Sequence, residues 1–199
     1  PDRYDFVMAQ PFGRDATAQR FRELSNAGTP LVFAWTAASG METTQNYLGL
    51  VLDDGYGRGY ASAQMLAEAL GGEGQVAMIN YGAQFFSTDQ RTIGAHDAFD
   101  EYDDIEIVAE RSFSDPGNAG DVARGILQGN SDLDGIWAVW MDPVAFGVSD
   151  AVLDLGREDE LVITTTDLGG ETGARRLASR DDPLVGTIAS GSISMGRNM

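Results

Sequence analysis

The sequence contains no cysteine, no lysine and only one histidine, His96. Without cysteine, the chain has no disulfide framework, no thiol nucleophile and no thiolate ligand for a metal. With one histidine it has no metal-binding histidine pair, and general-base catalysis would rest on carboxylates alone. His96 falls inside a predicted helix beside Asp97, a position that favours a solvated side chain over a catalytic base. These absences argue against most enzyme mechanisms.

Long apolar runs and nucleotide-binding motifs are also missing. No segment approaches the ~18 apolar residues that a membrane helix needs, and neither GxxxxGK[ST] nor a nucleophile elbow is present. The glycines of DDGYGRGY match a dinucleotide fingerprint only in part, and DPGNAGD is a poor match to a calcium loop. We therefore expect no cofactor, no metal and no membrane-spanning segment. The chain begins at Pro1 without a signal peptide, so we expect a preceding segment to have been removed.

The charge of the chain is strongly one-sided. Acidic residues number 31 against 13 basic residues, all of them arginine, and the formal net charge is -18. A chain this negative is repelled by nucleic acid and by anionic membranes. Such a surface either recruits cations or a basic partner, or is an adaptation to very high salt, where repulsion is screened within a few ångströms. Because lysine is absent and aspartate outnumbers glutamate about two to one, we favour adaptation to salt.

The predicted fold is organised around residues 133–167. A short apolar run of strand length, residues 136–140, is followed by Asp142 and Pro143, which suit the first turn of a helix. A second apolar strand follows at residues 161–165. Strand, helix and strand make the crossover unit of a parallel sheet, in which ligands bind beyond the carboxyl ends of the strands.

The same alternation extends over the rest of the chain. Further strands are predicted at residues 4–9, 30–35, 47–52, 75–79, 105–109 and 184–189. Further helices are predicted at residues 15–26, 60–70, 88–102, 118–128 and 171–178, with a flexible glycine-rich turn at 53–59 and the start of another helix at 190–199. Alternating strands and helices predict an α/β fold with mainly parallel sheets and helices on both faces.

Polar and aromatic side chains stand where the predicted strands end. Together they suit a sugar, because ring C–H faces stack on aromatic side chains while hydroxyl groups form charge-assisted hydrogen bonds with carboxylates and guanidinium groups. Trp137 falls in mid-strand and is expected in the core, whereas Trp35 and Trp140 fall at carboxyl ends and are expected in the site. The candidate ligand-binding residues are Trp35, Thr36, Arg91, Phe113, Trp140, Met141, Asp142, Asp167 and Ser190.

Six stretches carry a family resemblance: NAGTPLVFAW, LDDGYGRGYASAQMLAEALGGEGQVAMI, RTIGAHDAF, DGIWAVWMDPVAFGVSDAV, VITTTDLGG and VGTIASGSISMG. In this order they resemble the periplasmic binding protein type 1 superfamily, and within it the ribose/galactose-type sugar-binding proteins of ABC transporters. Each stretch alone is modest, but together they span nearly the whole chain.

The resemblance implies a periplasmic-binding-protein-like fold of two α/β lobes joined by three crossings, with one sugar in the cleft between them. Residues 1–52 would form a partial first lobe, residues 53–189 the second lobe, and residues 190–199 a truncated crossing back to the first. The family normally starts two strand–helix units earlier and continues further. The chain therefore resembles a fragment with an incomplete first lobe and part of the sugar site absent.

Individual residues match the ligand-binding motifs of the family. Arg91 matches the arginine of an R-x-x-G motif that hydrogen-bonds sugar hydroxyls, and Asp167 matches the aspartate that follows the corresponding strand. Asp142 matches the aspartate of an N-D pair, in which Met141 replaces the asparagine. The resemblance thus assigns ligand contacts to three charged residues.

Two other candidates depart from the family, because Trp35 stands where a polar residue is usual and Ser190 where a glutamine is usual. These departures are compatible with a sugar as the ligand, but they leave open which sugar it is. If Arg91 bonds sugar hydroxyls, Arg91→Ala should cost ~1.5–3 kcal/mol of affinity and much less stability.

The function implied by the resemblance is that of a non-enzymatic, extracytoplasmic receptor that captures a small carbohydrate and delivers it to an ABC permease. It would work in the periplasm or at the outer face of the cell membrane, with or without a lipid anchor. Two alternatives stay open. The sugar-responsive effector domain of a lac-repressor-family regulator shares the fold but needs a DNA-binding helix-turn-helix, and an α/β enzyme would have to use carboxylates. The sugar and the oligomeric state are not determined by the sequence.

Overall fold

The computed structural model describes residues 4–11, 15–38, 40–83 and 85–191. The chain divides into two compact units: Pro1–Asp53, Gln84–Ser87 and Gly191–Met199 form unit 1, and Asp54–Ala83 with Thr88–Ser190 form unit 2. Most of the helix start predicted at 190–199 lies outside the described residues. Within the described ranges, no helix is long and apolar enough to span a membrane.

Unit 1 contains a three-stranded parallel sheet in the order β1-β2-β3. Phe33 in the central strand is fully buried and packs against the rings of Phe21 and Tyr47, at centroid distances of 5.0 and 4.9 Å. The helix predicted at residues 15–26 is confirmed, and the predicted strands form over shorter ranges. The elements are β1 (Val7–Ala9), α1 (Asp15–Asn26), β2 (Leu31–Ala34) and β3 (Gly49–Val51).

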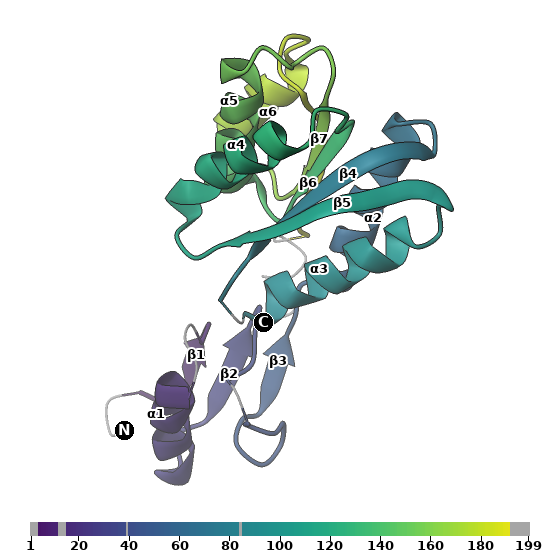
Figure 1. Cartoon of the computed structure of the whole chain (residues 1–199). Coiled ribbons are helices and arrows are strands. Elements are labelled where there is room, and N and C mark those ends of the chain that lie inside the picture. The colour runs from purple at the N-terminus through teal and green to yellow at the C-terminus, as the bar shows by residue number, and fades with distance from the viewer. Residues whose placement is uncertain (1–3, 12–14, 39, 84, 192–199) are drawn as a thin grey trace. The chain divides into compact units, whose positions relative to one another are not determined.

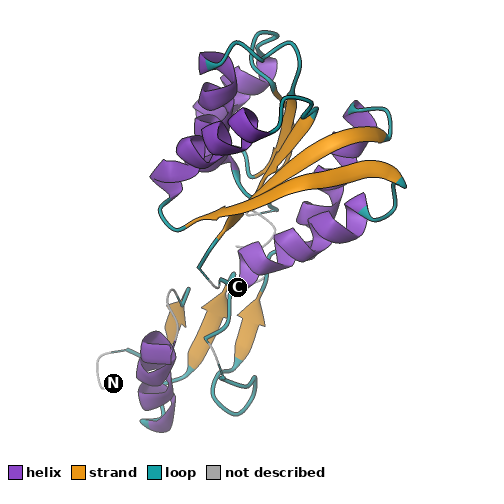
Figure 2. Cartoon of the chain, viewed as in Figure 1, coloured by secondary structure: helices purple, strands orange, loops and turns teal. Residues whose placement is uncertain are grey.

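Unit 2 contains a five-stranded sheet, all parallel, in the order β5-β4-β6-β7-β8. Its elements are α2 (Gly55–Ala69), β4 (Glu73–Tyr81), α3 (Phe86–Phe99), β5 (Asp104–Phe113), η1 (Pro116–Asn118), α4 (Ala119–Gly129), β6 (Gly135–Ala138), η2 (Met141–Ala145), α5 (Phe146–Asp154), β7 (Val162–Thr166), α6 (Gly170–Ala178) and β8 (Leu184–Ile188). Figure 1 shows α2 and α3 on one face of this sheet and α4, α5 and α6 on the other, and Figure 2 shows strands and helices alternating. The predicted α/β fold with parallel sheets is confirmed.

The core of unit 2 forms around the central strand β6. Trp137 is fully buried, as expected for a residue in mid-strand, and its indole N–H donates to the hydroxyl of Ser62 at 2.8 Å. Thr164 of β7 donates its hydroxyl to the carbonyl of Ser62 at 2.8 Å. Because buried donors without acceptors are costly, these bonds fix α2 over β6 and β7. The first turns of α2 are thereby placed beside the carboxyl ends of these strands.

The glycine-rich turn predicted at residues 53–59 is wrong, because most of this segment belongs to α2. Asp54 caps the helix, and its carboxylate accepts from the backbone N–H of Gly57 at 2.8 Å. Gly59 then lies so close to α3 that an added Cβ would overlap the carbonyl oxygen of Arg91. The glycines here permit a close helix–helix approach, and this packing outweighs their low helix propensity.

The helix predicted from Asp142 also begins later than expected. Asp142 has non-helical dihedral angles, φ -106° and ψ 122°, inside η2, and the regular helix α5 starts at Phe146. The peptide bond between Asp142 and Pro143 is cis. Asp142 is exposed, so its side chain stands in the loop after β6 and does not begin the helix.

Candidate functional site

The carboxyl ends of the parallel strands of unit 2 gather the predicted side chains along one row. Ile79, Ala138 and Thr165 are partners across β4, β6 and β7. Tyr81, Trp140 and Asp167 each lie two residues beyond these partners. Because the strands are parallel, the three residues follow the same edge of the sheet. The sequence-based expectation of a shared edge is therefore correct in geometry, and we call this part of unit 2 the carboxyl edge.

Asp167 is the central group of the carboxyl edge. Its backbone N–H donates to the carbonyl of Ile188 at 3.0 Å, and its own carbonyl accepts from the hydroxyl of Thr187. Its φ of 73° lies in the left-handed region, which aspartate tolerates better than most residues at a cost on the order of 1 kcal/mol. The Asp167 side chain is 37% exposed. The carboxylate is thus held by its backbone and still reaches solvent.

Arg91 comes from α3 and is buried at this edge. Its Nη1 donates to Asp167 Oδ2 at 3.0 Å, to Thr166 Oγ1 at 2.9 Å and to the carbonyl of Val139 at 3.2 Å. One guanidinium nitrogen therefore ties α3 to β7 and to the residue after β6. The side chain is only 8% exposed. Arg91 and Asp167 lie on one edge, as expected, but Arg91 is more deeply embedded than a side chain that simply faces a cleft.

Arg58 of α2 is the member of the site that sequence reasoning missed. Its Nη2 donates to Asp167 Oδ1 and, at 3.4 Å, to the carbonyl of Ile188. The side chain is 6% exposed. Arg58 was overlooked because its segment was interpreted as a flexible turn. The signal that could have found it is Asp54, an N-cap residue that places Arg58 in the first turns of a helix.

An aromatic cluster lies beside the charged groups. Trp140 packs edge-on against Tyr81 and Phe113, with centroid distances of 5.4 and 5.2 Å and interplanar angles of 72° and 82°. Tyr81 and Phe113 are themselves 5.6 Å apart. Phe113, the last residue of β5, is buried, whereas Trp140 is half-buried. Phe113 therefore supports the indole from inside the protein. Both Phe113 and Trp140 were predicted in the site, and of these two rings only Trp140 is partly exposed, so a ligand contact from Phe113 stays a prediction.

The remaining candidates divide between the core, the surface and unit 1. The side chain of Met141 is fully buried and packs beside Gly169 and Gly173, so it does not reach solvent at the carboxyl edge, and its contact with a ligand stays a prediction. Asp142 is exposed and Ser190 is half-buried. Trp35 and Thr36 follow β2 in unit 1, where Trp35 is half-buried and Thr36 is buried. A shared role for these two residues and the carboxyl edge stays a prediction.

A second polar cluster connects α3 to the sheet. His96 Nε2 lies 3.2 Å from Glu110 Oε2, and the other oxygen of Glu110 accepts from the side-chain amide of Asn80 at 2.5 Å. Thr92 donates to the amide oxygen of Asn80 at 3.2 Å. His96 thus takes part in an interaction between a helix and two strands.

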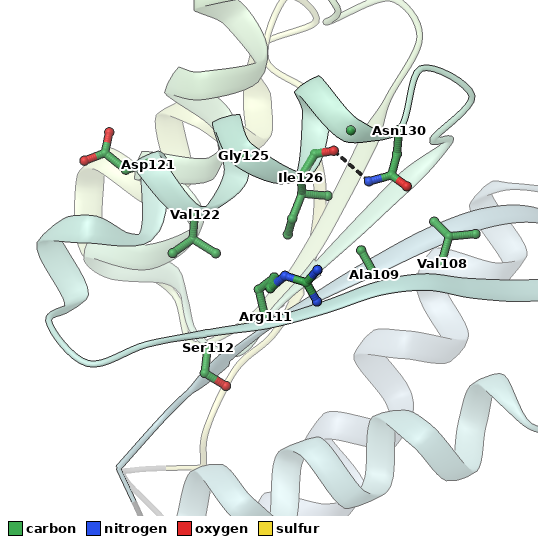
Figure 3. Close-up of a pocket in the computed structure, with 10 residues that line it drawn as sticks. Val108, Ala109, Arg111, Ser112, Asp121, Val122, Gly125, Ile126 and Asn130 are labelled. Atoms are coloured by element: carbon green, nitrogen blue, oxygen red, sulfur yellow. Dashed lines mark hydrogen bonds between the residues drawn. The ribbon is translucent and has the colours of Figure 1, made fainter.

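A groove of about 520 Å³ lies between β5 and α4 in unit 2. Figure 3 shows Arg111 extending from β5 between the two elements, and Asn130 bonded to the carbonyl of Ile126 at 2.7 Å. None of the predicted ligand-binding residues lines this groove. The groove is thus distinct from the set of residues at the carboxyl edge. Its lining residues are Val108, Ala109, Arg111, Ser112, Asp121, Val122, Gly125, Ile126, Gly129 and Asn130.

Both units have an α/β fold with parallel strands, and comparison with known families assigns the chain to one of these families. The chain matches the model of the periplasmic binding protein domain over residues 2–198. It belongs to this family, as the resemblance in its sequence indicated.

Relatives within the family bind sugars. The chain is 30% identical to the D-allose-binding periplasmic protein of Escherichia coli (strain K12) over 153 residues, which are 76% of this chain and 48% of the relative. A periplasmic solute-binding protein of an ABC transporter from Actinobacillus succinogenes 130z, with D-allose bound, is 27% identical, with a TM-score of 0.78, covering 90% of this chain and 64% of that one. A solute-binding protein from Agrobacterium vitis with bound D-fucose shares the fold at 24% identity, with a TM-score of 0.84, covering 99% and 67%. The chain thus spans about half to two thirds of these proteins.

Proposed function

We propose that this chain is part of an extracytoplasmic receptor that captures a small carbohydrate and delivers it to an ABC permease. The observation that carries the proposal is Asp167, a partly exposed carboxylate held at the carboxyl edge by two buried arginines. Half-buried Trp140, on the same edge, would offer its ring to the C–H face of a sugar. A carboxylate and an aromatic face side by side provide the two kinds of contact that a sugar needs.

The contacts at the carboxyl edge explain how such a site would work. Both oxygens of Asp167 have lone pairs beyond those used by the arginines, so each can accept a sugar hydroxyl in a charge-assisted hydrogen bond. Direct bonds from Arg91 to sugar hydroxyls, and contacts from Trp35, Thr36 and Ser190, remain part of the proposal. Binding would shift the receptor between its open and closed populations without chemical change.

Receptor function is favoured over the two alternatives by the kinds of protein to which the chain is similar. The named relatives are a D-allose-binding periplasmic protein and two solute-binding proteins of ABC transporters. We therefore place the protein outside the cytoplasm and infer a permease as its partner. No step of the proposed function requires a cofactor or a metal.

The proposal is tested by a sugar screen on the longest natural protein that contains this chain. Tryptophan fluorescence and melting temperature are followed with D-allose, D-fucose, L-arabinose and myo-inositol. At least one should bind, and Trp140→Leu should weaken it because the stacking face is lost. Asp167→Asn should weaken it roughly tenfold to a hundredfold through the lost charge-assisted bonds.

The matched control is Asp121→Asn, which removes a charge from an exposed ion pair on α4. It should leave sugar binding unchanged. Failure of every sugar to change fluorescence or melting temperature, in a protein that folds, would overturn the proposed function.

A further inference from the structure

We propose that Arg58 is a positioning residue, which holds the carboxylate of Asp167 in the orientation that accepts two sugar hydroxyls. The proposal rests on the proposed sugar-binding function. It adds Arg58, which belongs to none of the family's ligand-binding motifs that the chain matches. It assigns to the first turns of α2 a direct influence on affinity.

The two arginines bond to different oxygens of the Asp167 carboxylate. Arg58 donates to Oδ1 of Asp167, and Arg91 donates to Oδ2. A carboxylate held through one oxygen can still turn about its terminal torsion, which is soft. Held through both oxygens by donors from two different helices, its plane is fixed, and about two of its four lone-pair directions remain for a ligand. The partly exposed side of Asp167 is where those directions can be used.

The positions of the two arginines depend on one another. Gly59, the residue after Arg58, packs against the backbone carbonyl of Arg91 so closely that no Cβ would fit. Gly94 of α3 packs in the same way against the carbonyl of Tyr56. The two helices therefore meet at glycines next to the functional side chains, and this approach sets the distance between the guanidinium groups that share Asp167.

Electrostatics makes the arrangement cooperative. Two guanidinium groups with exposures of 6% and 8% repel one another at close range in a poorly solvated place. Asp167 lies between them as the shared anion, so a turn away from one arginine breaks the ion pair of Asp167 with that arginine. Without Arg58, the carboxylate has one fixed oxygen, and it is free to turn toward Arg91. The loss should appear as weaker binding of the ligand.

The test compares Arg58→Met, which keeps the aliphatic stem, with Arg58→Lys and with Arg124→Met. Arg124 is a matched control because it also bridges carboxylates, those of Asp121 and Asp154, on the outer surface. Calorimetry is done with whichever of D-allose, D-fucose, L-arabinose and myo-inositol the parent protein binds most tightly. Arg58→Met should bind roughly tenfold more weakly, Arg58→Lys should recover part of that loss, and Arg124→Met should bind like the parent.

A double-mutant cycle separates positioning from general stability. In the Asp167→Asn background, Arg58→Met should have little further effect on affinity, because the carboxylate it positions is gone. An equal further loss in that background would overturn the proposal, as would parent-like affinity of Arg58→Met in a protein whose Asp167 mutant binds weakly. If no sugar binds the parent protein, the proposed function fails instead. A crystal structure of Arg58→Met then still decides the positioning role, since an unmoved Asp167 carboxylate would contradict it.

Discussion

Four arginines of unit 2 represent two different surroundings, the carboxyl edge and the outer helical surface. At the edge, Arg58 and Arg91 are almost fully buried and share one carboxylate. On the surface, Arg124 and Arg175 are 38% and 77% exposed, although they form ion pairs with similarly short distances. Distance alone therefore does not distinguish these two surroundings. Burial does, since Arg58 and Arg124 each bond two protein acceptors.

The same comparison applies to the carboxylates. In a chain with 31 acidic residues, the residue type says almost nothing about function. Exposed pairs such as Arg175–Glu171 contribute about 0–1 kcal/mol and are screened by salt. Asp167 differs because both of its partners are buried and its backbone is tied to β8. We expect substitutions in the two surroundings to differ in their effect on stability, as the geometry implies.

The largest effect is expected at the helix crossing beneath the carboxyl edge. In Gly59→Ala, the new Cβ would overlap the carbonyl of Arg91, so α2 and α3 must separate. We expect a loss of about 2–3 kcal/mol in the free energy of unfolding, measured by denaturant titration. The matched control is Gly125→Ala in α4, where an added Cβ meets nothing within 4 Å. Its higher helix propensity should stabilise the protein by about 0.5–1 kcal/mol.

Equal effects of the two glycine substitutions would contradict the close crossing. A loss confined to Gly59→Ala would show that the crossing, and not glycine content as such, supports the site.

The next largest effect on stability is expected from replacing Arg91. From the sequence we expected Arg91→Ala to reduce affinity with little effect on stability. The structure changes that expectation, since Arg91 is buried and bonds three protein acceptors. Arg91→Met should lower the free energy of unfolding by about 2 kcal/mol, less than for a fully buried pair because Asp167 keeps Arg58 and partial solvation. The exposed control Arg175→Met should change it by less than about 0.5 kcal/mol.

Thermal unfolding of both arginine variants decides this prediction. A parent-like melting temperature for Arg91→Met would mean that its bonds contribute only to ligand binding, as the sequence alone indicated.

Salt should act differently on the two surroundings. At a net charge of -18, self-repulsion weakens the folded state in dilute buffer, and added potassium or sodium chloride should raise the melting temperature. Exposed ion pairs are screened by salt, so any decrease in melting temperature caused by Arg124→Met should vanish in molar salt. The deficit of Arg91→Met should persist, because buried charges are screened much less. A flat or falling melting temperature of the parent would refute the adaptation to salt.

Much of the fold could be predicted because the alternation of apolar strands and amphipathic helices is a local pattern. The shared edge of Tyr81, Trp140 and Asp167 also followed from it, since parallel strands present their carboxyl ends together. What could not be predicted depends on tertiary contacts. The helical state of the segment with Arg58 rests on a cap and on packing against α3, and both override glycine propensity.

The core position of Met141 was missed for a similar reason. A loop residue after a strand reads as accessible, and only the packed fold shows that its side chain turns inward beside Gly169. The resemblance assigned Arg91 and Asp167 to contacts with a sugar but did not predict that they bond to one another, and Arg58 matches no residue of the family's ligand-binding motifs.

The smallest expected effect is on stability at high pH, and it involves two tyrosines on the outer side of the α2–α3 pair. Tyr56 of α2 donates its hydroxyl to Asp97 at 2.9 Å, and this bond raises the pKa of Tyr56. The hydrogen bond to Glu101, with some desolvation, raises the pKa of Tyr60 to about 12. Because both pKa values lie above the ordinary value of 10.0, these tyrosines favour folding while protonated. Their contribution is complete below pH 10, and that of Tyr60 is lost as the pH rises toward about 12.

The alkaline titration of tyrosine measures this effect by ultraviolet absorbance of the tyrosinate. Tyr60→Phe should remove a late-titrating group and reduce the loss of stability between about pH 10 and 12. The change should be small because both hydroxyls lie on the surface, where solvent weakens such bonds. Tyr4→Phe is the control, since Tyr4 is 69% exposed in unit 1. If Tyr60→Phe and Tyr4→Phe remove groups that titrate at the same pH, the outer hydrogen bonds of α2 contribute nothing to folding, and only the buried side of the crossing does.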